Sequence, residues 1–186
     1  VNMMVQRYLE KRVAEILDTN VSAEEIRAYY ENNPFEFEID EYLVRAILIQ
    51  LPKDAAIANE LWGLYRKSDS VALERMRELT IDRARYKHLD LDAWLRFNEV
   101  QGVLPPNAVE YPDYFVKQRS KRRFEDDEFY YFVNIVDYRT GTSPLEFEQE
   151  NIRSRILQQR MSELREEVKE QAIKDVYEKG LVKSYE

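Results

Sequence analysis

Residues 21–51, with the sequence VSAEEIRAYYENNPFEFEIDEYLVRAILIQL, constrain the fold more than any other stretch of the chain. Ser22 precedes Glu25 by three residues, which is the spacing of a capping box, where each side chain accepts a hydrogen bond from the other residue's backbone N–H. Val21 and Ile26 flank this box at the spacing of a hydrophobic staple. The sequence therefore predicts a helix that begins directly after Ser22 and ends before Pro34.

A change of hydrophobic period follows this helix. From Tyr42 onward the apolar residues alternate with a period of two and occupy both faces of the predicted strand. One face carries Leu43, Ile47, Ile49 and Leu51, and the other carries Tyr42, Val44 and Leu48. A strand that is apolar on both faces belongs in the interior of a covered sheet, so we expect residues 42–51 to form a central strand.

The C-terminal part of the chain predicts one long helix. Ser143, Pro144 and Glu146 give a second helix start, and Gly180 is placed to end the helix near Lys179. At about 35 residues this helix would be roughly 50 Å long. Its apolar stripe consists of Ile152, Ile156, Leu157, Met161, Leu164, Val168, Ala172 and Val176. We expect it to supply the packing partner that a helix over 2–18 and the helix after Ser22 lack.

The middle of the chain is predicted to add three helices and a hairpin. The helices are expected over 55–67, 70–80 and 93–100, with Val71, Leu73, Met76 and Leu79 forming the apolar side of the second, and residues 82–92 are expected to be irregular. Residues 114–139 are predicted to form the hairpin, with a turn at 125–128 and a second arm beside the first strand. The predicted fold is α+β: a domain over 39–140 inserted into a helical module of 1–38 plus 141–186.

Composition excludes several classes of function. The 28 basic and 36 acidic residues give a net charge of -8, which argues against nonspecific binding to nucleic acid or to an anionic membrane. The chain has no cysteine, and His88 is its only histidine. Disulfides, thiolate chemistry, transition-metal sites and Ser–His hydrolysis are therefore not expected, and we interpret His88 as a surface loop residue. No cofactor is expected.

Targeting segments are not visible in the sequence. No run of about 18 apolar residues is present, so no membrane-spanning helix is expected. The chain begins at Val1 and lacks a signal-like region, so we interpret it as a mature or partial chain whose targeting segment is missing.

Clusters of like charge offer three further candidate sites. The pairs Asp90 with Asp92 and Asp126 with Asp127 have the composition of acid–base or calcium sites, but such pairs are more often solvated loop residues in a chain with 36 acids. Basic residues gather over 117–123 directly before the acidic residues 125–128. We interpret this cluster as a charged hairpin arm, not as a phosphate-binding surface.

Several segments together resemble the parvulin-type peptidyl-prolyl isomerases, in the form found within extracytoplasmic chaperones such as SurA, PpiD and PrsA. VSAEEIRAYYENNPFEF resembles the family's lead-in helix, VRAILI its first strand, LDLDAW its Gly-Asp-Leu-Gly segment, and FYYFVNIVDYR its last strand. SPLEFEQENIRSRILQQRMSEL resembles the helix that returns to the chaperone module. The resemblance covers nearly the whole chain and implies a parvulin-like domain within a periplasmic folding chaperone.

The sequence departs from this family at the positions that the resemblance implies are catalytic. Ala46 and Tyr131 stand where the active family has histidines, and Asp82 falls in the region of its Cys or Asp. Leu89 and Asp92 replace the two glycines of the turn. Because alanine cannot form a side-chain hydrogen bond and a glycine-dependent turn rarely accepts leucine, we expect prolyl isomerase activity to be lost.

Aromatic and apolar residues provide candidate binding surfaces. Trp94, Phe97, Tyr130 and Tyr131 are either core residues or the lining of a shallow groove for unfolded or Pro-containing segments. The apolar stripe over 152–176 is expected to be mostly internal packing, with part of it available as a cradle for a client or a second subunit.

Three hypotheses about function follow. The first is a periplasmic or otherwise extracytoplasmic chaperone that binds unfolded or partly folded envelope proteins and carries a degenerate isomerase domain. Anchoring to a membrane through the missing N-terminal segment is compatible with this hypothesis. The second is an active prolyl isomerase that uses Asp82 and Tyr131. The third is an assembly scaffold that binds one folded partner through the long helix. A homodimer formed through the helical module is compatible with the first and third hypotheses.

Overall fold

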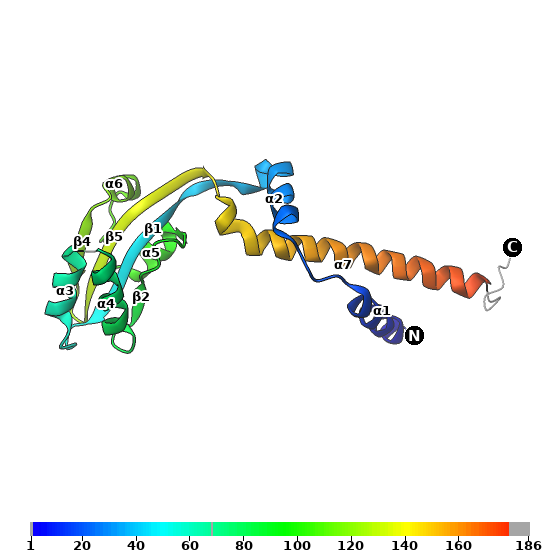
Figure 1. The fold of residues 1–186 in the computed structure, drawn as a ribbon, viewed down its shortest axis with the longest axis horizontal. Helices are drawn as coiled ribbons and strands as arrows, with labels where there is room; N and C mark the ends of the chain where they lie inside the picture. The colour runs from blue at the N-terminus through cyan, green and yellow to red at the C-terminus, as the bar shows by residue number, and fades with distance from the viewer. Residues whose placement is uncertain (1, 68, 179–186) are drawn as a thin grey trace. The chain divides into compact units, whose positions relative to one another are not determined.

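The computed structural model describes residues 2–67 and 69–178, and its fold is α+β, as predicted. The chain divides into two compact units, each of which is described by itself. Unit 1 contains the described residues up to Glu36 and those from Glu148 onward, whereas unit 2 is Phe37–Phe147. Figure 1 shows the order of the elements along the chain.

Unit 2 is built on an antiparallel sheet. Among the described residues the strand order is β2-β1-β5-β4, and β3 also pairs with β1. The strands are β1 (Glu38–Pro52), β2 (Tyr86–His88), β3 (Leu95–Arg96), β4 (Lys121–Glu125) and β5 (Phe129–Thr142). The long strands β1 and β5 are paired along most of their length, with irregularities between Ile39 and Leu43 and between Arg45 and Ala46. The predicted pairing of two strands far apart in the sequence is therefore confirmed.

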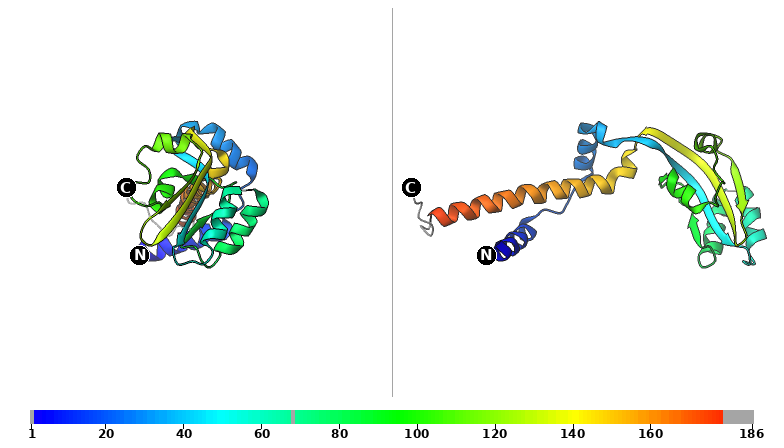
Figure 2. Two further views of the ribbon diagram at one scale, coloured as in Figure 1. Left: turned by 90° about the vertical axis from the view of Figure 1, so that its left-hand side faces the viewer. Right: turned by 180° about the vertical axis from the view of Figure 1, so that it is seen from behind.

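Helices cover both faces of this sheet, as Figure 2 shows. The helices α3 (Ala58–Lys67) and α4 (Ser70–Thr80) cover one face, and α5 (Phe97–Val103) and α6 (Pro112–Lys117) cover the other. The α3–α4 cluster contains Ile47, Ile49, Leu51, Ile57, Leu61, Tyr65, Met76, Leu79, Leu89 and Phe132. The α5–α6 cluster contains Val44, Ala46, Leu48, Phe97, Val100, Leu104, Phe115, Val116, Tyr131, Val133 and Ile135. Strand β1 contributes to both clusters, which confirms that it is apolar on both faces.

Four expectations about unit 2 were wrong in part. Residues 82–92 are not wholly irregular, because 86–88 form β2, and the helix expected over 93–100 begins only at Phe97. Residues 114–117, the start of the expected hairpin arm, belong to α6 (Pro112–Lys117), which has a proline at its N-terminal turn. Val71 of α4 is 78% exposed instead of packed. The short strands β2 and β3 were not predicted because they are defined by backbone hydrogen bonds to β1, which leave little periodic signal in the sequences of the short strands themselves.

Unit 1 begins with two short helices, α1 (Asn2–Ile16) and α2 (Ala23–Asn32), followed by the 3-10 turn η1 (Pro34–Phe37). The predicted capping box is confirmed: Ser22 Oγ accepts a hydrogen bond from Glu25 N at 3.2 Å, and Glu25 Oε2 accepts one from Ser22 N at 2.9 Å. Val21 and Ile26 are both buried, as a hydrophobic staple requires. The chain therefore enters α2 in the predicted way.

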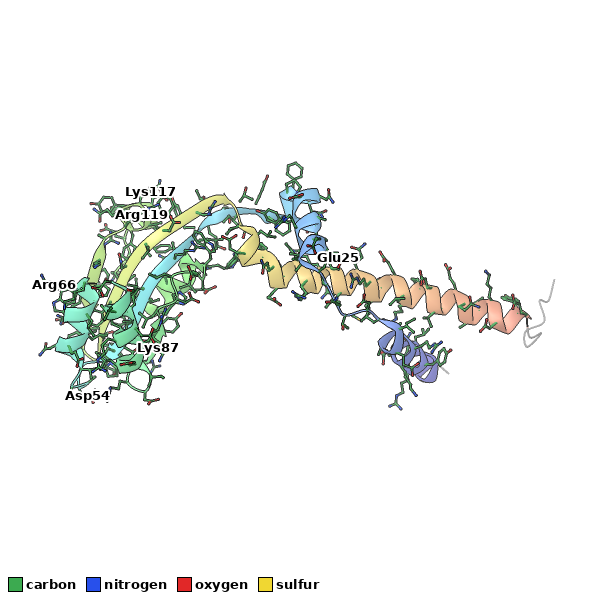
Figure 3. All side chains as sticks on the ribbon, viewed as in Figure 1. Glu25, Asp54, Arg66, Lys87, Lys117 and Arg119 are labelled. Atoms are coloured by element: carbon green, nitrogen blue, oxygen red, sulfur yellow. The ribbon has the colours of Figure 1, made fainter. Side chains whose placement is uncertain are left out.

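The long helix α7 (Leu145–Glu178) passes from unit 2 into unit 1, where its arginines hold the segment between α1 and α2. Arg153 donates a hydrogen bond to the carbonyl oxygen of Val21 at 3.2 Å. Arg160 donates to the carbonyl oxygens of Asp18 and Asn20 at 3.0 and 2.7 Å and forms an ion pair with Glu25, which is labelled in Figure 3. These contacts confirm that α7 is the partner the short helices lack.

Two expectations about the end of α7 lie outside the described residues: the helix end near Lys179 and its cap at Gly180. The side chain of Val176, the last residue of the predicted stripe, is also outside the described part of the structure. Within residues 2–67 and 69–178, no helix combines the length and the apolar character needed to cross a membrane.

Candidate functional site

Ala46 lies deep inside unit 2. It is on β1 opposite Ile135 of β5, and its exposed fraction is 0%. It belongs to the α5–α6 cluster, together with Phe97 of α5 and Phe115 of α6. A substrate cannot contact Ala46 without displacing these packed side chains, and a methyl group offers no hydrogen bond to an amide.

Tyr131 shares this cluster with Ala46, but its hydroxyl is already hydrogen-bonded to other side chains of unit 2. The Tyr131 hydroxyl donates a hydrogen bond to Asp126 Oδ2 at 2.5 Å and accepts one from Gln50 Nε2 at 3.4 Å. Burial raises the pKa of Tyr131, and the hydrogen bond to Asp126 adds to this effect. The same hydrogen bond lowers the pKa of Asp126. The pair therefore consists of a neutral phenol and a charged carboxylate near neutral pH.

Asp126 organises the turn between β4 and β5. Its Oδ1 accepts hydrogen bonds from the backbone N–H groups of Glu128 and Phe129, at 2.9 and 2.7 Å. The interpretation of the acidic pairs as solvated loop residues missed this role. The sequence signal for such a turn is an aspartate whose side chain can accept hydrogen bonds from the backbone N–H groups of the residues two and three positions later.

Asp82 is not part of this arrangement. It is exposed in the turn that follows α4, a helix whose buried side chains contribute to the α3–α4 cluster on the opposite face of the sheet. The structure brings Ala46 and Tyr131 into one cluster but leaves Asp82 outside it.

The four aromatic residues expected to line one groove are distributed over three environments. Phe97 and Tyr131 are in the α5–α6 cluster, where the Phe97 ring lies 5.7 Å from that of Phe115. Tyr130 packs against the α3–α4 cluster, with the guanidinium of Arg123 over its ring at 4.4 Å. Tyr130 and Tyr131 are separated in this way because successive residues of a strand point to opposite faces.

Trp94 occupies the third environment, in which charged side chains surround its indole ring. Its Nε1 donates a hydrogen bond to Glu146 Oε1 at 3.2 Å, and the guanidinium of Arg45 lies over its ring at 4.4 Å. Arg45 also forms an ion pair with Glu146 at 3.6 Å. The pKa of Glu146 is lowered, first by its own backbone N–H and then by Trp94 and Arg45. Trp94 is 7% exposed, so its ring is covered.

His88 is not a loop residue, which corrects the expectation for it. It lies on β2 opposite Leu48 of β1, and its Nε2 atom is buried without a hydrogen-bond partner among the described residues. This placement has no recognisable sequence signal, because β2 is only three residues long.

The basic residues over 117–123 are bound to groups within unit 2. Lys117 pairs with Asp113 at 2.9 Å, and Arg119 pairs with Asp137 at 3.0 Å. Lys121 Nζ donates to the carbonyl oxygen of Arg66 at 2.6 Å. Figure 3 labels Lys117, Arg119 and Arg66. These contacts agree with a charged arm that is tied to its own domain.

An open groove of mixed polar and apolar lining lies between α1 and α7 in unit 1, with a volume of ≈ 760 Å³. Tyr8, Ile16 and Ile173 project large apolar surfaces into it and are 57%, 46% and 50% exposed. We call it the α1–α7 groove, and its lining is Tyr8, Arg12, Ile16, Glu167, Val168, Glu170, Gln171, Ala172, Ile173, Lys174 and Asp175.

The groove exists because the apolar stripe of α7 is only partly covered. Ile152 is fully buried, but Met161 is 44% exposed, and Leu164, Val168 and Ala172 are only partly buried. Among the described stripe residues only Met161 is exposed, so the stripe is covered along most of its length but incompletely. The cause is length: α1 has 15 residues and spans about 22 Å, whereas the 34 residues of α7 span about 50 Å.

Comparisons with known proteins place few constraints on the chain. No protein family model and no curated protein matches it. Among solved structures, it is similar to one described with the virulence factor PEB4 and the periplasmic protein Cj1289, two structurally related SurA-like chaperones of Campylobacter jejuni. That alignment covers 100% of this chain and 70% of the other, with 14% sequence identity and a TM-score of 0.36.

Proposed function

We propose that the chain is a SurA-like extracytoplasmic folding chaperone that holds apolar segments of unfolded or partly folded envelope proteins in the α1–α7 groove. The observation that carries this proposal is the exposure of Tyr8, Ile16 and Ile173 around one open groove. Large apolar side chains that stay exposed around one hollow are available to bind a partner. The function requires no metal, nucleotide or covalent chemistry.

The chemistry of the groove suits transient binding of many sequences. Tyr8 offers a large flat ring with little conformational entropy to lose, and the isoleucines offer aliphatic surface. Burial of apolar area contributes roughly 25 cal/mol per Å² and is not directional, so different apolar segments gain similar free energies. A groove that recognises area instead of a hydrogen-bonding pattern is expected to release its client when the client folds.

Unit 2 is proposed to be a parvulin-like domain without isomerase activity. Catalysis of prolyl isomerisation requires stabilisation of a twisted amide against a barrier of about 18–20 kcal/mol. Ala46 is buried and has no polar group, while the Tyr131 hydroxyl already donates to Asp126. The order of the strands, with β1 and β5 central, is compatible with the resemblance of VRAILI and FYYFVNIVDYR to the first and last strands of that family.

An aggregation assay tests the chaperone function. An unfolded outer-membrane protein is diluted from denaturant with increasing amounts of the chain, and light scattering is followed. We expect the chain to delay aggregation and the double variant Tyr8→Gln with Ile173→Gln to bind about tenfold more weakly, since ~1.4 kcal/mol of lost apolar burial corresponds to a factor of ten.

The matched control is the double variant Tyr111→Gln with Ile81→Gln. These residues belong to unit 2 and are 65% and 67% exposed. The control therefore replaces one exposed tyrosine and one exposed isoleucine, as the groove variant does, but at positions outside the groove. Equal loss in both double variants, or no delay of aggregation by the wild-type chain, contradicts the proposal.

The other two hypotheses predict different results. An active isomerase would turn over an X-Pro peptide and lose that activity in Tyr131→Phe or Asp82→Ala. A scaffold would bind a single folded partner at fixed stoichiometry and would not bind unfolded chains. Either result would replace the chaperone function proposed above.

A further inference from the structure

The charged residues around the α1–α7 groove are unevenly distributed. Among the lining residues, α7 supplies the three acids Glu167, Glu170 and Asp175 but only one base, Lys174. The lining base on the opposite wall is Arg12 of α1. The wall formed by α7 is therefore both apolar and acidic.

Local pairing leaves part of this negative charge available to a ligand. Arg12 is already paired with Glu15 at 3.1 Å, and Asp175 accepts a hydrogen bond from Gln171 at 2.7 Å. Glu167 and Glu170 make no hydrogen bond or ion pair with any described residue. Both are exposed on the same wall as Ile173, so their carboxylates lie beside the apolar surface that a client would cover.

Two neighbouring cations on α7 are directed elsewhere. Lys169 pairs with Glu166 at 3.1 Å, and Arg165 donates a hydrogen bond to the side chain of Gln6. These contacts keep two of the nearest positive groups from neutralising Glu167 and Glu170. A bound segment that carries lysine or arginine would supply the positive charge that α7 does not place beside Glu167 and Glu170.

We propose that the groove selects client segments in which bulky apolar residues alternate with lysine or arginine, and that it discriminates against acidic segments of equal hydrophobicity. This inference rests on the function proposed above and specifies its substrate class. The apolar side chains provide affinity without sequence preference, and the unpaired glutamates provide the discrimination. Charges at the rim of a binding site act in this way because they steer encounter and penalise like-charged partners.

A second copy of the chain is a poorer occupant of the groove. The chain has a net charge of -8, and a partner that inserted its own α7 would bring a second acidic wall against the first. Like-charge contacts of this kind oppose association at low ionic strength. A basic apolar polypeptide has the opposite charge and meets no such repulsion.

Three peptides of identical apolar sequence test this inference, with spacer positions filled by lysine, glutamine or glutamate. Binding to the full chain is measured by fluorescence anisotropy at low salt and at about 1 M salt. We expect the lysine peptide to bind about tenfold more tightly than the glutamate peptide, with the glutamine peptide between them. The difference is expected to shrink at high salt, where the Debye length falls to about 3 Å.

A pair of matched variants locates the effect. Glu167→Gln with Glu170→Gln is expected to reduce the preference for the lysine peptide at least threefold and to leave binding of the glutamine peptide unchanged. Glu31→Gln with Glu110→Gln changes the net charge equally at exposed sites outside the groove and is expected to retain the preference.

The outcomes separate the two proposals. If all three peptides bind with equal affinity, or if the control variant loses as much preference as the groove variant, the charge selectivity is overturned while the chaperone function stands. If none of the three peptides binds the wild-type chain, the proposed function itself is overturned.

Discussion

The hydroxyl of Tyr131 and the carboxylate of Asp126 are joined by a hydrogen bond of 2.5 Å. This contact ties the start of β5 to the turn that precedes it, because the same carboxylate accepts the backbone N–H groups of Glu128 and Phe129. A tyrosine at a position that the family resemblance marks as catalytic thus serves the folding of its own hairpin.

Tyr131→Phe is expected to lower the free energy of unfolding at neutral pH, because the variant loses this hydrogen bond from a side chain that is 4% exposed. The pKa of Asp126 is lowered, so its contribution is present above its unfolded pKa and is lost as the pH falls through the folded value. The pKa of Tyr131 is raised, so its contribution is present below about pH 10 and is lost as the pH rises through the folded value.

Urea unfolding at several pH values measures this dependence. The difference between wild type and Tyr131→Phe is expected to be constant between about pH 5 and pH 9 and to shrink on both sides of that range. Tyr111→Phe, at a residue that is 65% exposed, is the control and is expected to have little effect at any pH. A pH-independent difference would contradict the assigned pairing.

Tyr65→Phe tests a second buried hydroxyl. Tyr65 of α3 is fully buried and donates a hydrogen bond to the carbonyl oxygen of Val133 at 2.6 Å, while Arg122 N lies 3.1 Å from its oxygen. Burial raises the pKa of Tyr65, so the hydroxyl stays protonated. The variant leaves buried backbone groups of β4 and β5 without this partner and is expected to lose about 1–3 kcal/mol in denaturant unfolding. A loss below about 0.5 kcal/mol would show that the hydroxyl is not needed.

Ser22→Ala tests the helix start in unit 1. The variant removes the oxygen that caps α2 and is expected to cost about 1 kcal/mol, measured by urea unfolding monitored through helical circular dichroism. The remaining stabilisation by Glu25 depends on pH. Its pKa is lowered by the Ser22 backbone N–H and by Arg160, so this contribution is lost as the pH falls below about 4.5. Ser154→Ala changes an exposed serine of α7 and serves as the control.

Ala46→His tests whether the implied catalytic position is accessible. We expect no gain of prolyl isomerase activity and a loss of about 1–3 kcal/mol in stability, because the imidazole would be forced into a cluster in which Ala46 has no exposed surface. Ala28→His, at an exposed position of α2, provides the reference for the substitution itself. Measurable turnover of an X-Pro peptide by Ala46→His would show that the site opens.

The sequence allowed several elements to be predicted because their determinants are local. The capping box depends on residues three positions apart, and the two-faced strand and the long stripe repeat within a few residues. Family resemblance identified Ala46 and Tyr131 as positions of interest. It did not reveal that Gln50 and Asp126 bind the Tyr131 hydroxyl, although the Asp126 turn has a recognisable local pattern.

The sequence by itself determined that β1 is a buried central strand and that α7 is long and carries an apolar stripe. Only the tertiary structure decided that Tyr130 and Tyr131 serve opposite faces, that Ala46 is sealed beneath α5 and α6, and that Tyr8 and Ile173 meet at an open groove. The physical reason is that hydrophobic periodicity indicates which side chains of an element are buried, whereas the side chains that pack over them come from elements elsewhere in the chain. The length of α1 relative to α7 then left part of the stripe without such a partner.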